Sequence, residues 1–354
     1  MKKYLTIAAA AVLLASCSGD SEINKAAELS APVPIQLGTS MQLTATRGNS
    51  QAIQSTELEP GQTVGVYIYY KDATTTNTTY SYGYKNLAYT VDDHTVTGGT
   101  AGDLSLVTAL EQPYYPENKS QNIDIYAFSP RTGVYTSTGE LGTLTAQNVF
   151  ATAADQTSDA NYKASDFVWG KAANVANGTS TAIEIPLKHK LSKVNVNIAP
   201  GTGMTLAKLD KAKITLNGVV LDGTVNFTTG SVTPRSGSAA SSVILTSGVD
   251  QTVTTSFNDA SSNSHTACSS SAVIIPQTIA ASTSFITIQL WDAAANSGAG
   301  AYTSTYNVTT SAASTFAAET VYTYNIIVNT QGLTLTTTIA DWTPAGSVVN
   351  GTAE

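Results

Sequence analysis

The most regular pattern of hydrophobic and polar positions in the chain runs from residue 33 to residue 47. Apolar residues or Thr occupy the odd positions, and mostly polar residues stand between them. A period of two over this length is typical of a β-strand that buries one face. We expect the strand to end at Arg47, which is followed by Gly48 in a turn open to a protease. The apolar positions expected to face a core are Val33, Ile35, Leu37, Met41, Leu43 and Ala45.

Short segments rich in β-branched and aromatic residues recur along the rest of the chain, with turn residues between them. Helical periodicity is weak, and residues 104–110 are the best short helix candidate. We predict loops at residues 170–178 and in the Ser-, Thr- and Gly-rich stretch 231–271. The predicted strands cover residues 64–70, 123–128, 183–187, 191–198, 214–221 (with a turn or bulge at 217–218), 273–275, 285–291, 322–328 and 333–339.

Many short strands with little helix predict an all-β fold, organised as two β-sandwich domains in tandem. A break at residues 200–203 and the loop-rich stretch before it suggest a domain boundary near residue 185. The expected divisions are a signal peptide (1–16), a tether and N-terminal strand (17–47), a first domain (48–185) and a second domain (186–354).

The N-terminus has the form of a lipoprotein export signal. Lys2 and Lys3 precede an apolar segment too short to span a bilayer, and residues 14–17 (Leu-Ala-Ser-Cys) match a lipobox. We expect cleavage before Cys17 and lipidation of this residue. The lipid would anchor the precursor to the cell outer membrane without a transmembrane segment.

Composition narrows the function. Charged residues are 12% of the chain, the net charge is −8 and the pI is about 4.9. With no basic patch to neutralise phosphates, nucleic acid is not an expected partner. Apart from Cys17 the only cysteine is Cys268, so no internal disulfide is expected and the core must supply the stability.

The sequence contains no recognisable catalytic arrangement. Its three histidines are far apart, and no nucleophile elbow, phosphate loop or dinucleotide fingerprint occurs. We therefore predict neither an enzyme, a cofactor nor a metal. Residues 92–94 (Asp-Asp-His) favour a turn over a cation site. Seven tyrosines between residues 67 and 89 favour cross-strand packing over stacking on sugars.

Several segments, in order along the chain, resemble the fimbrillin family, the subunits of type V pili in Bacteroidales. The nearest likeness is to the fimbrillin-like branch. The segments are Tyr-Pro-Glu at 115–117 with Ile-Asp-Ile-Tyr-Ala-Phe-Ser-Pro at 123–130, Ser-Asp-Phe-Val-Trp at 165–169, the stretch 187–194 around His189, Ile-Pro-Gln within 273–278, and 322–328 followed by Ile-Ala-Asp-Trp at 339–342.

This resemblance implies two transthyretin-like β-sandwich domains and polymerisation by donor-strand exchange. A surface protease specific for Arg would cut after Arg47 and release the N-terminal strand. A strand from another copy, or from a related pilin, would then fill the groove. The mature subunit would belong to an extracellular fimbrium that supports adhesion to a host or bacterial surface ligand.

The segment that a subunit donates is expected within residues 332–350. Its candidate apolar positions are Leu333, Leu335, Ile339, Val348 and Val349. The sequence also fits residues 333–342 as a permanent strand of the second domain, with residues 343–354 as the donor. Arg47 could simply cap an exposed strand end. A tip adhesin of the same pilus and an uncleaved surface lipoprotein that binds glycans remain as alternative functions.

Overall fold

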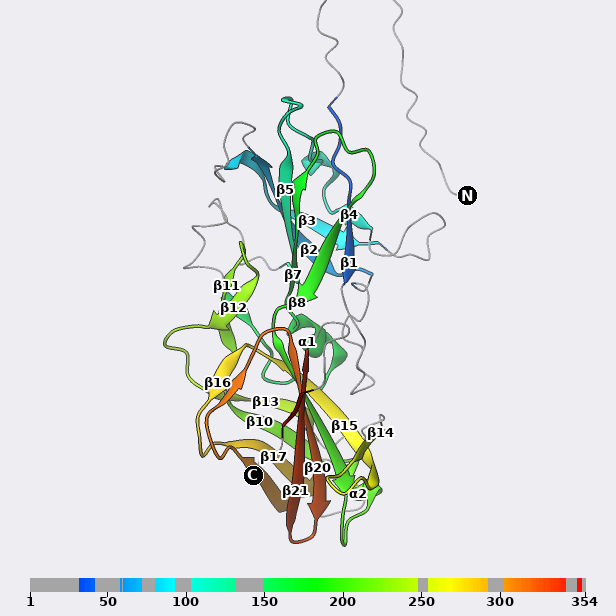
Figure 1. Ribbon diagram of the computed structural model, residues 1–354, viewed down its shortest axis with the longest axis vertical. Helices are drawn as coiled ribbons and strands as arrows, with labels where there is room; N and C mark the ends of the chain where they lie inside the picture. The colour runs from blue at the N-terminus through cyan, green and yellow to red at the C-terminus, as the bar shows by residue number, and fades with distance from the viewer. Residues whose placement is uncertain are drawn as a thin grey trace, which may run out of the picture.

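The structure, a computed structural model, describes residues 32–41, 58, 60–71, 80–92, 103–131, 149–247, 254–291, 302–341 and 349–351. These residues are organised almost entirely as β-strands, which confirms the all-β prediction. The described helices are α1 (Asp159–Ala164), α2 (Leu206–Leu209) and a 3₁₀ turn, η1 (Ala109–Glu111). The molecule is elongated, with two groups of strands stacked along its long axis (Figure 1).

The upper group of strands is a seven-stranded sheet in the order β1-β8-β7-β5-β2-β3-β4. Its central strands, β2 and β5, are rich in Val, Ile and Tyr and are buried on both faces, as β-branched and aromatic residues favour. The strands are β1 (Leu37–Met41), β2 (Thr63–Lys71), β3 (Tyr80–Val91), β4 (Leu104–Leu106), β5 (Ile123–Ser129), β7 (Val168–Val175) and β8 (Ile183–His189).

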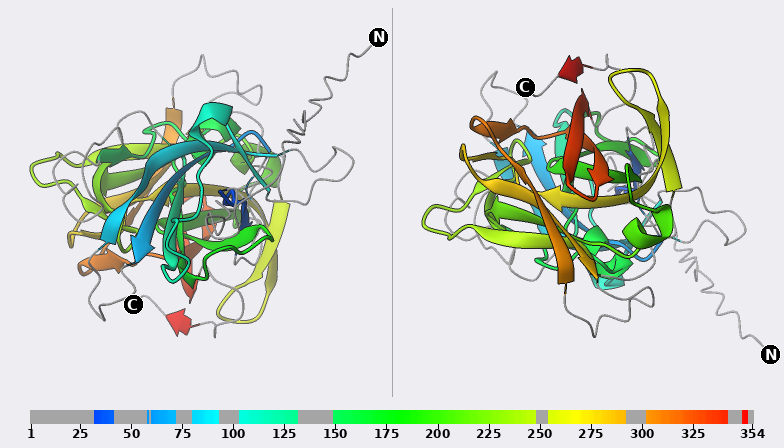
Figure 2. Two further views of the ribbon diagram at one scale, coloured as in Figure 1. Left: turned by 90° about the horizontal axis from the view of Figure 1, so that it is seen from above. Right: turned by 90° about the horizontal axis from the view of Figure 1, so that it is seen from below.

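The lower group contains a six-stranded sheet, β14-β15-β9-β20-β21-β22, and a four-stranded sheet, β13-β10-β17-β18. In the views along the long axis, the short strand β22 lies at the periphery (Figure 2). The bounds are β9 (Ser192–Pro200), β10 (Lys213–Val219), β13 (Ser241–Ser247), β14 (Thr254–Asn258), β15 (Ser264–Ile274), β17 (Ser284–Trp291), β18 (Tyr302–Thr309), β20 (Thr320–Asn329), β21 (Gly332–Asp341) and β22 (Val349–Gly351).

Two smaller sheets complete the described fold. One is β12-β11-β6, formed by β6 (Val149–Ala151), β11 (Asp222–Asn226) and β12 (Ser231–Pro234), and the other pairs β16 (Gln277–Ile279) with β19 (Ser314–Phe316). Because β6 pairs with β11, this sheet joins segments far apart in the sequence.

Buried hydrophobic side chains form two clusters. The first lies around β1, β2, β5, β7 and β8, and the second around β9, β10, β15, β17 and β20. The chain passes from the upper sheet to the six-stranded sheet between His189 and Ser192. Phe227, just after β11, nevertheless packs in the first cluster. The division into tandem domains at residue 185 stays a prediction.

The stretch 231–271 is not a long loop, contrary to the sequence prediction. It forms β12, β13, β14 and most of β15. Its hydroxyl groups have partners inside the fold: Ser269 donates to Asn197 Oδ1 (2.7 Å) and Ser271 to Asn195 Oδ1 (2.8 Å). A Ser-rich segment can be a buried strand when a neighbouring strand supplies acceptors.

Two smaller predictions were also wrong. Residues 170–178 are mostly strand β7, in which Gly170 allows a close approach, since a Cβ there would lie 2.2 Å from Pro186 O. Residues 104–110 form strand β4 and the start of η1 instead of a helix, because β4 pairs with the end of β3. The predicted irregularity at residues 217–218 is confirmed as a register shift, with Gly218 at φ +75°.

Candidate functional site

The N-terminal strand lies between two walls of the upper sheet (Figure 1). On one side, β1 pairs in parallel with β8, aligning Leu37 with Ile183 and Met41 with Leu187. On the other side, the Ile35 N–H donates to Pro113 O (2.9 Å) and the Tyr115 N–H to Val33 O (3.0 Å). An isolated antiparallel bridge joins Gly38 to Asp103, next to β4. Residues 33–41 therefore close the gap between strands β8 and β4.

The alternation predicted for this strand is present in the described part. Ile35 and Leu37 are 2% and 3% exposed and belong to the first cluster, and Thr39 is also buried. At the even positions, Pro34 and Gln36 are exposed, whereas Gly38, which has no side chain, is buried. The side chain of Met41 and residues Leu43 and Ala45 lie outside the described residues. Burial of one face explains why this segment folds as a strand.

The wall formed by residues 113–115 is fixed by tyrosine side chains. The Tyr114 N–H donates to the Tyr84 hydroxyl (3.1 Å), and the Tyr70 hydroxyl donates to Tyr114 O (3.0 Å). The Tyr70 and Tyr84 rings meet edge to face at 6.5 Å. Burial, with a smaller contribution from Tyr84, raises the pKa of Tyr70, so its hydroxyl stays a donor at physiological pH.

Tyrosines are thus the support of a groove wall, a role that sequence reasoning missed. The favoured packing interpretation is confirmed for those whose side chains are described. Tyr67, Tyr69 and Tyr89 are buried, and Tyr69 packs edge to face on Tyr126 of the neighbouring strand β5.

The opposite wall is strand β8. Ile183, Ile185 and Leu187 are buried in the first cluster, and the Ile183 N–H donates to Gln36 O (2.9 Å). Strand β7 pairs with only the end of β8, from Leu187 to His189. Pro186 has no N–H to offer, which helps to explain why the β7–β8 ladder stops there.

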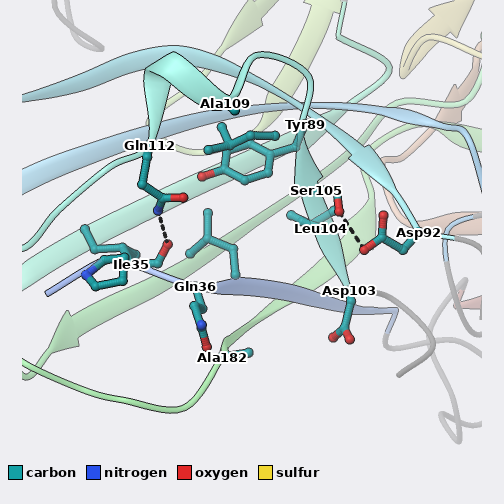
Figure 3. A pocket seen from close by; sticks show the side chains of 13 residues that line it. Ile35, Gln36, Tyr89, Asp92, Asp103, Leu104, Ser105, Ala109, Gln112 and Ala182 are labelled. Atoms are coloured by element: carbon teal, nitrogen blue, oxygen red, sulfur yellow. Dashed lines mark hydrogen bonds between the residues drawn. The ribbon is translucent and has the colours of Figure 1, made fainter. Parts of the chain in front are cut away.

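A pocket of about 500 Å³ borders the N-terminal strand (Figure 3). Gln112 donates to Ile35 O (3.3 Å), and the Ser105 hydroxyl donates to Asp92 Oδ2 (2.7 Å). The buried Tyr89 hydroxyl has no hydrogen-bond partner within the described residues. The lining is formed by Pro34, Ile35, Gln36, Leu37, Tyr89, Asp92, Asp103, Leu104, Ser105, Leu106, Ala109, Gln112 and Ala182.

The candidate donor segment is built into the six-stranded sheet of the monomer. Strand β21 pairs antiparallel with β20 over its whole length, from Gly332 to Asp341. Leu333 and Leu335 are half-buried against the second cluster. Ile339 pairs with Val349 of β22 through the backbone, and the side chains of both lie outside the described part, as does Val348. Whether β21 is donated stays a prediction.

The expected processing residues lie outside the described residues: Cys17, Arg47 and Gly48. Within the described part, no group of three or more His, Cys, Asp and Glu side chains could hold a metal, and no helix there is long and apolar enough to cross a membrane. Cys268 is a free, buried thiol, and burial, with a smaller contribution from Asp210, raises its pKa to about 12.

Two of the segments that carry the family resemblance meet in a buried polar cluster. His189 at the end of β8 lies 2.8 Å from Asp166, measured from Nδ1 to Oδ1, and both are nearly fully buried. Lys193 on β9 is 6% exposed; burial lowers its pKa to about 8, partly offset by Asp166. This cluster fixes the end of β8 where the chain crosses to the lower sheets.

Residues 46–342 match a family model described as fimbrillin-like. The chain belongs to the fimbrillin-like family. The match covers most of the chain, from just before Arg47 to Trp342, and confirms the resemblance inferred from the separate segments. Fimbrillin-like proteins are structural proteins of fimbriae and adhesion, and fimbriae are extracellular appendages built from associating subunits.

Solved structures agree on the fold. A proposed cell adhesion protein from Bacteroides ovatus superposes with a TM-score of 0.62 at 17% identity, covering 89% of this chain and 100% of the other. A proposed cell adhesion protein from Bacteroides uniformis gives 0.56 at 18% identity, covering 88% and 98%. At these identities the likeness shows the fold alone. A search of curated proteins found no match to this fimbrillin-like chain.

Proposed function

We propose that this fimbrillin-like protein is a fimbrial stalk subunit that polymerises by strand exchange. It is exported as a lipoprotein through Cys17 and cut after Arg47 by an Arg-specific surface protease. Residues 33–46 then leave, and the C-terminal region 332–350 of another copy or a related pilin occupies the groove. The subunit thus passes from the outer membrane to an extracellular fimbrium that carries adhesion.

The observation that carries this proposal is the seating of residues 33–41. The segment hydrogen-bonds to both walls and buries Ile35 and Leu37, yet it precedes Arg47 by only a few residues. Burial of two such side chains stabilises by roughly 1.5–3 kcal/mol each, on the order of 5 kcal/mol together. That is enough to hold the strand while it is part of the chain, and small enough for another strand to replace it after cleavage.

The other arginines help to explain why a protease would choose Arg47. The Arg131 side chain donates to Asn86 O through Nε (3.3 Å) and Nη2 (3.2 Å). Arg235 is exposed, but its N–H donates to Asp222 O (2.8 Å) and its carbonyl accepts from Ser238 (3.2 Å). Since proteases bind substrates as extended chains, both sites are poor substrates in the folded protein.

The deciding experiment determines the N-terminal residue and lipid content of protein recovered from the cell surface. We expect Gly48 as the first residue and no attached lipid. On a denaturing gel we expect a ladder of bands from polymers of increasing length that resist SDS. The Arg47→Ala variant should retain an acylated Cys17 and form no ladder, whereas the matched Arg235→Ala control should behave as the unaltered chain. An acylated monomer from the unaltered chain would refute the stalk function.

A tip adhesin is the second candidate, favoured by the complete pairing of β21 with β20. A strand that stays in its own sheet is not available to a neighbour. A tip subunit would accept a strand at its groove without donating one, and the C-terminal deletion described in the Discussion separates the two functions.

A further inference from the structure

The two walls of the groove differ in how they are held. Strand β7 pairs with β8 only through Val168–Gly170 and then continues along β5 as far as Val175. Within the described residues, positions 183–186 of β8 pair with β1 and with no other strand. The N-terminal half of β8 therefore depends on β1 for its backbone hydrogen bonds.

The wall formed by residues 113–115 does not depend on β1 in this way. Tyr114 is held from the far side by the hydroxyls of Tyr84 and Tyr70. Next to it, Asn177 Nδ2 donates to Pro116 O (2.8 Å), and β4 pairs with β3. Removing β1 leaves these contacts in place.

The C-terminal end of β8 is also fixed independently of β1. It pairs with β7, His189 contacts Asp166, and the Lys190 N–H donates to Phe167 O (2.8 Å). The residues that lose their neighbours when β1 leaves are therefore confined to the first half of the strand. Ile183 and Ile185 lie there, aligned with Leu37 and Thr39 of β1.

We infer that the groove has a firm wall at residues 113–115 and a loose wall at residues 183–186, whose backbone is paired only when a strand is seated in the groove. The functional meaning of this inference rests on the proposed strand exchange. The C-terminal strand of a second copy pairs first with the firm wall, and β8 then closes onto it. Ordering residues 183–186 costs conformational entropy, which a strand with apolar side chains at alternate positions offsets by burying them. Closure of β8 therefore favours incoming strands that have this alternation.

The inference is tested by hydrogen–deuterium exchange in the full chain. The double substitution Ile35→Asp with Leu37→Asp places charges on the buried face and should expel β1. We expect the amides of Ile183 and Ile185, which face β1, to exchange at least tenfold faster than in the unaltered chain, while those of β5 keep their rates. The Gln36→Asp control alters an exposed position of the same strand and should change neither.

Unchanged protection at Ile183 and Ile185, with the amides of residues 35–41 fully exchanged, would overturn the inference. If the amides of β5 also exchange faster in the double variant, the exchange rates of β8 and β5 are compared in the milder Leu37→Ala variant instead. In either variant, an added peptide of residues 31–46 should restore protection of the Ile183 and Ile185 amides. Because this readout requires no fibre, a protein that shows the loose wall but never polymerises would refute the proposed function and leave the inference standing.

Discussion

Ile35 and Leu37 hold the N-terminal strand through their burial, and their neighbours Pro34 and Gln36 face outward. Such an alternation can be recognised in the sequence because side chains of a strand point to opposite faces in turn. The residues that receive this strand could not be recognised in the same way. Tyr70, Tyr84 and Tyr114 become a support only because three distant segments meet.

Leu37→Ala should destabilise the precursor by about 2–4 kcal/mol, since it leaves a cavity in the first cluster. Urea unfolding of the precursor measures the loss, and Gln36→Ala, at an exposed position, is the matched control. The same change should not affect the stability of the finished fibre, from which residue 37 has been removed. A loss below about 0.5 kcal/mol in the precursor would contradict the importance of this contact.

Lys193 should make stability depend on pH. Burial lowers its pKa from the ordinary 10.5 to about 8, with Asp166 opposing the shift. Between these values the unfolded chain binds more protons than the folded chain, so the unfolding free energy rises with pH from about 8 to 10.5. The expected rise is about 1–3 kcal/mol by urea unfolding. Lys193→Met should abolish it, and Lys188→Met, on β8, should preserve it.

Strands β1, β8 and β21 show what pairing adds to an element that the sequence already predicts. All three have the expected alternation or apolar content, but their neighbours define their roles. Strand β8 is paired with β7 at one end and with β1 at the other, whereas β21 is paired with β20 throughout. The divided pairing of β8 suits a wall that opens, whereas the continuous pairing of β21 suits a permanent strand of the sheet.

A disulfide between the residues that immediately precede β1 and β8 should block strand exchange. Gln36 and Ala182 are exposed, both border the pocket, and Figure 3 shows them together below the strand. Gln36 O accepts from the Ile183 N–H, which brings the two backbones within disulfide reach. The oxidised Gln36→Cys/Ala182→Cys variant should be cut after Arg47 but form no ladder.

Reduction should release the strand in that variant and restore ladder formation. Each single cysteine variant is the control and should polymerise without a reductant. Ladders from the fully oxidised double variant would show that residues 33–41 need not leave.

At the scale of the molecule, the first hydrophobic cluster joins parts of the chain that are far apart in the sequence. Trp169 of β7 donates through Nε1 to Phe227 O (2.7 Å) and packs against Gly230, where a Cβ would lie 2.5 Å from the indole ring. Phe227 in turn packs against Phe128 in the first cluster, with the rings tilted and their centroids 4.6 Å apart. The β11–β12 hairpin thereby ties the second half of the chain to the first.

Deleting residues 343–354 should stop ladder formation while leaving the fold nearly intact. The deletion removes β22, which pairs with β21 at only three positions. Circular dichroism and the melting temperature measure the fold, and SDS-resistant ladders measure polymerisation. The full-length Val348→Asp/Val349→Asp variant should lose ladders too, and Asn350→Asp should keep them. Ladders at the unaltered level after the deletion would exclude the tail as donor.

The sequence by itself determined the all-β class, the N-terminal strand with its buried face and the family, because period-two patterning and short motifs are local properties. It did not determine which Ser-rich segments become buried strands, since the partners of Ser269 and Ser271 lie on β9, more than 70 residues away. Only the tertiary structure decided that β1 closes a gap between β8 and β4. Pairing between distant strands depends on the whole chain, and so do the firm and loose walls that result from it.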